Sequence, residues 1–211
     1  LMAKPRHLLS IVGFLLVTGA IIFLTQEKER YTRSPVHYHI PSVTLLNQNA
    51  QPVSLFEYLN CEKPVMLEFV FTSCTTLCPN QSVKFSNFQK RLQPDTDRVR
   101  LVSISVDPET DSPEVINSYL QKYHAAPGWD FLTGSKAAIE KVMQAFNIKA
   151  SDMITYDSSL LLRSPADGQW VRIDGQLENQ DLLREYRLIT GAGAWPRDAA
   201  LDALRLAGRP A

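Results

Sequence analysis

The most informative segment of the sequence is Val65-Met66-Leu67-Glu68-Phe69-Val70-Phe71-Thr72-Ser73-Cys74-Thr75-Thr76-Leu77-Cys78-Pro79. Its apolar first half is too short for a helix and rich in strand formers, so it predicts a buried strand. The two cysteines follow where this strand gives way to a predicted helix, which is where ligands bind in α/β sheets. A helix N-terminus also stabilises a thiolate over a thiol. The sequence therefore places the chemistry at Cys74 and Cys78.

Strand and helix patterns alternate on both sides of this stretch. Ser112-Pro113-Glu114 is a strong helix start, and residues 159–163 and 170–173 flank a turn-rich segment that predicts a hairpin. The pattern as a whole predicts an α/β domain with a thioredoxin-like central sheet flanked by helices. The expected strands are 43–46, 53–55, 65–71, 99–106, 129–132, 159–163 and 170–173, and the expected helices follow residues 79 and 112 and cover 139–146 and 181–189.

Length and charge limit the possible functions. The chain has 211 residues, enough for one full core and a short extra segment. Its 22 basic and 22 acidic residues balance, which argues against nucleic acid as a partner. The chain has 3 cysteines, too few for a disulfide scaffold but enough for one working pair and a spare, Cys61.

The N-terminal region carries a targeting signal. Residues 8–24 are uncharged and follow Lys4, Arg6 and His7, and a run of about 17–25 apolar residues can cross a bilayer. A cleaved signal peptide is the alternative, although no A-x-A-like cleavage site follows. We expect an N-terminal transmembrane helix, with the globular part on the exported side, the periplasmic side in a bacterium. The expected divisions are an anchor over 1–24, a linker over 25–41, a thioredoxin-like domain over 42–190 and a C-terminal tail over 191–211.

The spacing of the two cysteines allows two kinds of chemistry. Residues i and i+4 share one face of a helix, so Cys74 and Cys78 can approach closely enough for a disulfide. As thiolates the same sulfurs suit Cu(I) or Zn(II). The plain alternative is a pair of buried core cysteines that never react.

Three sequence blocks resemble the SCO1/SenC family over roughly residues 40–190. The first block is residues 69–79 around the cysteines, the second is Val102-Ser103-Ile104-Ser105-Val106-Asp107-Pro108-Glu109-Thr110-Asp111-Ser112-Pro113, and the third is Phe131-Leu132-Thr133-Gly134-Ser135. The resemblance implies a membrane-tethered thioredoxin fold that assists assembly of the CuA centre of cytochrome c oxidase. It also implies that Cys74 and Cys78 bind copper or act on thiols.

The family completes its copper site with a distant histidine, and this chain departs from that pattern. Counting back from Pro165 places Tyr156 at the histidine position, and a shift of one residue would place Asp157 there. A phenol is a poor ligand near neutral pH and a carboxylate is a hard one, so neither replaces an imidazole for Cu(I). The third ligand is therefore unknown.

Other residues offer weaker candidates. His37 and His39 alternate, so an extended segment would point both to one side, as a metal pair or as exposed polar residues. His124 fits a helix C-terminus, Cys61 fits a loop as an incidental thiol or a third sulfur, and Asp107 either faces the cysteines or forms a turn. The C-terminal tail contains apolar residues that could dock on a partner or on the domain itself.

Three functions remain open from the sequence. The first is an SCO-like protein that delivers copper, reduces thiols or does both during oxidase assembly. The second is a metal-free thiol–disulfide oxidoreductase, in which Cys74 attacks and Cys78 resolves. The third is a non-catalytic accessory subunit of a membrane respiratory complex.

Overall fold

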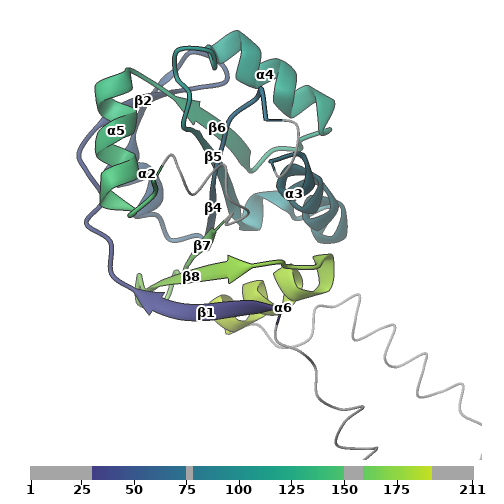
Figure 1. Ribbon diagram of the computed structural model, residues 1–211. Helices are drawn as coiled ribbons and strands as arrows, with labels where there is room; N and C mark the ends of the chain where they lie inside the picture. Colours follow the sequence, from purple (N-terminus) through teal and green to yellow (C-terminus); the bar gives the residue numbers. More distant parts are fainter. Residues whose placement is uncertain (1–29, 75–77, 150–158, 192–211) are drawn as a thin grey trace, which may run out of the picture. The chain divides into compact units, whose positions relative to one another are not determined.

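The computed structural model describes residues 30–74, 78–149 and 159–191. Eight strands form one sheet in the order β1-β8-β7-β4-β5-β6-β2-β3 (Figure 1). The strands are β1 (Tyr31–Val36), β2 (Thr44–Asn47), β3 (Pro52–Ser54), β4 (Val65–Val70), β5 (Arg100–Ser105), β6 (Trp129–Thr133), β7 (Leu160–Arg163) and β8 (Trp170–Gly175). The helices are α2 (Leu55–Leu59), α3 (Cys78–Leu92), α4 (Pro113–Lys122), α5 (Lys136–Ala145) and α6 (Asn179–Thr190), with a 3₁₀ turn η1 (Thr96–Arg98).

The centre of the sheet is parallel and its margins are antiparallel. β4 pairs in parallel with β5, and β5 with β6, whereas β7 runs antiparallel to β4. Val70 at the end of β4 lies opposite Ser105 at the end of β5, so the loops after these two strands begin side by side. Every residue of β4 is buried, which explains its nearly continuous apolar sequence.

Helices cover both faces of the sheet, as the sequence predicts for a thioredoxin-like domain (Figure 1). Met66 and Val70 of β4 pack in one core cluster with residues of α3, α4 and α6, including Cys78 and Phe85. Alternate residues of β4 pack in a second cluster with residues of α2 and α5. The period of two along the strand therefore assigns each β4 side chain to one core or the other.

Local sequence signals fix the helix ends. The Ser112 side chain accepts a hydrogen bond from the Val115 amide at the start of α4, which confirms the predicted start. Glu178 and Asp181 form a reciprocal capping box at the start of α6. Gly191 ends that helix with a left-handed backbone, φ 61°.

The predicted hairpin is present. β7 and β8 pair antiparallel, with Leu160 opposite Ile173 and Arg163 opposite Trp170. The connection contains Gly168 with φ 70°, a conformation that favours glycine. The early strands predicted at 43–46 and 53–55 are also present, as the antiparallel neighbours β2 and β3.

The expected linker over residues 25–41 is wrong for its middle part. Residues 31–36 form the edge strand β1, which pairs antiparallel with β8 along its whole length. Its sequence is polar because most of its side chains face solvent, and Pro35 is tolerated because an edge strand leaves some amides unpaired. The compact domain accordingly begins at Tyr31, earlier than the expected residue 42.

None of the helices in the described ranges is both long and apolar enough to span a membrane. The predicted anchor over residues 1–24 and the tail over 192–211 lie outside the described residues. The transmembrane helix therefore stays a prediction from the sequence.

Candidate functional site

Cys74 and Cys78 lie together between the end of β4 and the beginning of α3. The Cys74 amide donates to the Phe71 carbonyl at 3.2 Å, which closes a turn after the strand. Cys78 is the first residue of α3, and its amide donates to the Cys74 sulfur at 3.4 Å. The two residues are thiols, with no disulfide between them. The Cys74 sulfur thus lies at a helix N-terminus, where amide donors and the helix dipole favour negative charge.

The two sulfurs differ in exposure and in protonation. Cys78 is 4% exposed, and burial, reinforced by a hydrogen bond to Cys74, raises the pKa of its thiol to about 12. A backbone hydrogen bond from Phe71 acts in the opposite direction and is outweighed. Cys74 is only partly buried. The geometry therefore offers Cys74 as the sulfur that a partner can reach and keeps Cys78 as a protonated thiol behind it.

A buried carboxylate supports the turn that carries Cys74. Asp111 is fully buried, and the Thr72 amide donates to its Oδ1 and Oδ2 at 3.2 and 3.3 Å. The Thr72 hydroxyl donates to Asp111 Oδ1, and the Ser105 hydroxyl donates to Oδ2 at 2.6 Å. Asp111 therefore joins the loop after β5 to the loop after β4.

A second buried carboxyl lies on the Cys78 side of β4. Glu68 is fully buried, and its position between Met66 and Val70 directs it to the core that contains Cys78. The Ser103 hydroxyl donates to Glu68 Oε1 at 2.6 Å. Burial raises the pKa of the Glu68 carboxyl to about 8, so this side chain is mostly protonated at neutral pH. Its charged form would raise the pKa of Cys78 further.

The remaining thiol, Cys61, is separate from the pair. It packs against the core on the α2 and α5 side of the sheet, whereas Cys74 and Cys78 belong to the opposite core. Its sulfur donates to the Lys63 carbonyl at 3.5 Å. A third sulfur ligand from Cys61 is therefore excluded by the sheet that lies between them.

Most of the other candidate residues are exposed or structural. His124 follows the end of α4 with a positive φ of 54° and is exposed. Asp107 forms a turn, since its carbonyl accepts from the Thr110 and Asp111 amides at 3.1 and 2.9 Å. The structure therefore supports the second interpretation of Asp107, a turn-forming residue, over one that faces the cysteines.

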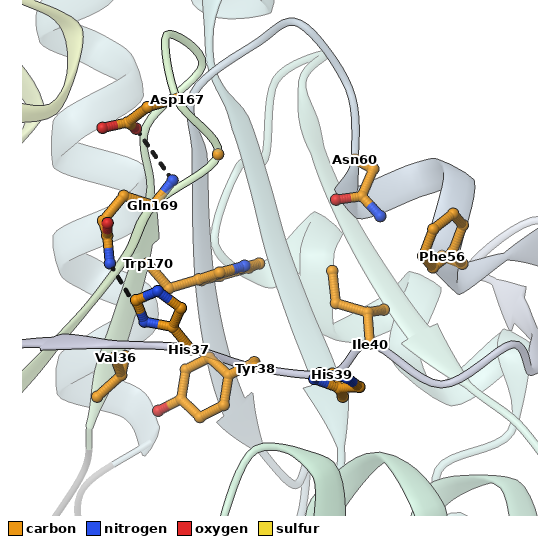
Figure 2. Close-up of a pocket in the computed structure, with 11 residues that line it drawn as sticks. Val36, His37, Tyr38, His39, Ile40, Phe56, Asn60, Asp167, Gln169 and Trp170 are labelled. Carbon is orange, nitrogen blue, oxygen red and sulfur yellow. Dashed lines mark hydrogen bonds between the residues drawn. The ribbon is translucent and has the colours of Figure 1, made fainter.

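His37 and His39 are exposed and line a pocket of about 420 Å³ beyond the end of β1 (Figure 2). Trp170 and Phe56 contribute to its walls, and neither Cys74 nor Cys78 does. Gln169 Nε2 lies 3.5 Å from Nδ1 of His37. Figure 2 shows the imidazoles of His37 and His39 on either side of Tyr38 and apart from each other.

Within the part of the chain that the structure describes, no group of three or more histidine, cysteine or acidic side chains is arranged to hold a metal ion. Tyr156 and Asp157, at the expected position of the third ligand, lie outside the described residues. The donors that the structure brings together are the two sulfurs.

Neither Asp111 nor Glu68 is identified as a site residue by the sequence pattern alone. Each had a signal: Glu68 is the one acidic residue in an otherwise apolar strand, and Asp111 directly precedes the helix start at Ser112. Neither signal identifies a partner, because Thr72 lies 39 residues from Asp111 and Ser103 lies 35 residues from Glu68.

The sheet, its covering helices and a dithiol between β4 and α3 define a thioredoxin-like protein with its cysteine pair at the end of a central parallel strand. The SCO1/SenC family model matches residues 34–181, and the chain belongs to this family.

Three relatives illustrate the match. The SCO1 protein homolog of Bacillus subtilis is 32% identical over 173 residues, which is 78% of this chain and 88% of the relative. The solved structure of BsSco, a member of the Sco family of cytochrome c oxidase assembly proteins with a disulfide switch, superposes with a TM-score of 0.61 at 30% identity. The superposition covers 77% of this chain and 99% of the BsSco chain. ScoI of Bradyrhizobium japonicum, solved with copper bound, gives a TM-score of 0.56 at 23% identity over 74% of this chain and 98% of that one, and shows the shared fold.

Proposed function

We propose that this protein is a membrane-anchored Sco protein that assists assembly of the copper centre, CuA, of a respiratory cytochrome c oxidase. Cys74 and Cys78 are the working residues in this proposal, as ligands for Cu(I) cargo, as a redox pair, or as both. The observation that carries it is the 3.4 Å contact between the Cys78 amide and the Cys74 sulfur at the start of α3. Membership of the Sco family supports the oxidase as the client.

Copper delivery fits the donors at this site. Thiolate sulfur is a soft ligand and suits Cu(I), as it also suits Zn(II). Binding of Cu(I) requires both thiols to lose their protons. Because the pKa of Cys78 is high, its proton is lost only when the free energy of metal binding compensates. Two sulfur ligands leave the ion open to a client's ligands, which suits a protein that hands its cargo on.

Thiol reduction uses the same two residues. The Cys74 thiolate attacks one sulfur of a client disulfide, which forms a mixed disulfide and releases one client thiolate. Cys78 then loses its proton and attacks Cys74 Sγ, which releases the second client thiol and leaves a Cys74–Cys78 disulfide. The client is reduced by two electrons and the dithiol is oxidised by two. The partly buried Cys74 and the buried Cys78 match the attacking and resolving roles.

The anchor and the exported location rest on the sequence. Residues 8–24 are uncharged and follow a basic flank, and basic flanks stay on the cytoplasmic side. The test fuses a reporter enzyme, of a kind that is active only in the periplasm, after residue 41. The reporter should be active, and the fusion protein should stay in the membrane fraction after a carbonate wash. Release by carbonate would overturn the anchor, and an inactive reporter would overturn the orientation.

A Cu(I) titration of the full-length protein against a chelator of known affinity tests the copper role. We expect one Cu(I) per chain. Cys74→Ala or Cys78→Ala should lower the affinity by more than about 100-fold, because even an outer-shell partner of a metal is worth about 10–100-fold. Cys61→Ser is the matched control, since that thiol faces the other core, and it should bind as tightly as the parent. Equal affinity in all variants would overturn the copper role.

The metal-free oxidoreductase is the second candidate. It is favoured by Tyr156, which stands in the sequence where the family has its ligand histidine. Reduced protein should then convert a small disulfide substrate to thiols in the presence of a copper chelator, and Cys78→Ser should stop at the mixed disulfide. Loss of all exchange on adding the chelator would exclude this candidate.

A further inference from the structure

The buried Asp111 side chain joins the two loops that leave the central strands beside the dithiol. A carboxylate that is fully withdrawn from water is costly unless its oxygens are hydrogen-bonded. Within the described residues no ion pair to Asp111 is seen, and both of its oxygens accept from Thr72 or Ser105. Hydrogen bonds to a charged acceptor are roughly twice as strong as neutral ones, so this carboxylate has an energetic reason to hold Thr72 in one place.

Thr72 is the residue through which this network reaches the site. It lies in the turn that the Cys74 amide closes onto the Phe71 carbonyl at 3.2 Å. Both the backbone amide and the hydroxyl of Thr72 are bound by Asp111. The start of this turn is also fixed by the hydrogen bond from the Val106 amide to the Val70 carbonyl at 3.0 Å. The turn that carries Cys74 is therefore attached to the β5 side at two successive points.

The loop that carries Asp111 is itself ordered by hydrogen bonds. The Ser105 hydroxyl, which donates to Asp111, accepts from the Asp107 amide at 3.0 Å. The Asp111 amide donates back to the Asp107 carbonyl at 2.9 Å. Ser112, the next residue, caps α4. Asp111 is thus fixed from both sides, which a residue needs if it is to position another segment.

We propose that Asp111 is the positioning residue for Cys74. Through Thr72 it holds the turn so that the Cys74 sulfur stays at the first turn of α3, within reach of Cys78. The inference deepens the proposed function, on which its biological meaning rests, because both a shared metal and a disulfide need the two sulfurs at one place. Preorganisation of this kind raises the effective concentration of one thiol at the other.

The test compares Asp111→Ala with Asp181→Ala in the full-length protein. Asp181 is an equally suitable control because it is also a buried carboxylate, 7% exposed, and accepts from the Glu178 amide in the capping box of α6. Each variant is equilibrated with reduced and oxidised glutathione, so that two protein thiols and one glutathione disulfide exchange with the Cys74–Cys78 disulfide and two glutathione thiols.

Asp111→Ala should lower the equilibrium constant for the protein disulfide by about tenfold, or about 30 mV in reduction potential. Cu(I) affinity should fall about tenfold as well. Asp181→Ala should leave both unchanged although it lowers the melting temperature. Asp111→Asn keeps one acceptor oxygen for Thr72, although a neutral one, and should restore part of the equilibrium constant. Thr72→Val, which removes only the hydroxyl, should have a smaller effect that is not additive with Asp111→Ala.

Two outcomes would overturn the inference. The first is an equal shift of the disulfide equilibrium in Asp111→Ala and Asp181→Ala, at a temperature where circular dichroism shows both folded. The second is unchanged hydrogen exchange of the Thr72 and Cys74 amides in Asp111→Ala, because the proposed contact protects that turn. The hydrogen-exchange measurement needs neither copper nor a client. If the parent protein binds no Cu(I) and reduces no disulfide, the proposed function is overturned, but the exchange measurement still tests the role of Asp111.

Discussion

The Ser103 hydroxyl donates a 2.6 Å hydrogen bond to Oε1 of Glu68, while Oε2 of the same carboxyl is buried without a partner among the residues that the structure describes. Ser103 in turn accepts from the Trp129 indole at 3.0 Å. A fully buried carboxyl with one orphan oxygen is more stable with its proton than without it. The pKa of Glu68 is raised to about 8 because of this preference for the protonated form. Glu68 lies in β4, the strand directly before the dithiol.

Glu68 should make the stability of the protein fall as the pH rises. The unfolded chain releases this proton near the ordinary glutamate pKa of 4.5, and the folded protein keeps it up to about 8. Between these values the folded state binds more protons, so the free energy of unfolding decreases with pH. The decrease should reach about 2–4 kcal/mol. Denaturant unfolding measured from pH 5 to pH 8.5 checks it.

Glu68→Gln should remove that pH dependence and be more stable than the parent at pH 8, since an amide stays neutral. Ser103→Ala serves as the opposite control. Its hydroxyl lowers the pKa of Glu68, so its loss should move the decrease to higher pH. Parallel pH profiles for the parent and Glu68→Gln would show that Glu68 is ionised in the folded protein.

Cys78 should react slowly with alkylating agents in the folded protein. The thiolate is the reactive form, and burial, the main cause of the raised pKa of about 12, persists when Cys74 is removed. In a Cys61→Ser/Cys74→Ser background, Cys78 should react with iodoacetamide at pH 8 about 100-fold more slowly than free cysteine. In urea the two rates should agree. A folded-state rate equal to that of free cysteine would contradict the assigned burial of Cys78.

Restoring an imidazole at the family's histidine position should strengthen copper binding. A phenol keeps its proton near neutral pH, whereas imidazole nitrogen is a good ligand for copper. We expect Tyr156→His to raise Cu(I) affinity by about tenfold or more, measured by chelator competition. Tyr156→Phe is the control and should bind like the parent. If Tyr156→His also binds like the parent, the residue at 156 is not the missing ligand.

The edge strand β1 should contribute to stability through Glu185. This carboxylate is 1% exposed and accepts from the Tyr31 hydroxyl at 2.9 Å and from Arg33 Nε at 3.0 Å. The double variant Tyr31→Phe/Arg33→Met leaves the Glu185 carboxylate without these partners and should lower the free energy of unfolding by about 1–3 kcal/mol. This value is below that of a fully buried ion pair because Arg33 is 41% exposed and water screens its charge.

Thermal or denaturant unfolding measures the cost of losing these partners. Thr32→Ala, on the same strand but exposed, is the control and should be close to neutral. If the double variant unfolds like the parent, β1 is only loosely attached and residues 31–36 behave as the linker that the sequence suggested.

The difference between prediction and structure at β1 has a simple cause. An edge strand exposes most of its side chains, so residues 31–36 carry the polar composition that also marks a linker. Their pairing with β8 depends on residues about 140 positions away, and no local pattern encodes that partner. The buried strand β4 was predictable because burial on both faces favours a nearly continuous apolar sequence.

The sequence was enough to predict the α/β class, the position of the dithiol at the end of a central strand, the hairpin and the start of α4, because these depend on short-range spacing and on burial. It also determined the family through blocks of motif residues. The three-dimensional arrangement was needed to show that Cys61 faces the opposite core, that Cys78 is the protonated and buried thiol, and that Asp111 reaches Thr72. These relationships join residues distant in the chain, and their physical effects follow from burial and contact, which arise when the sheet is assembled.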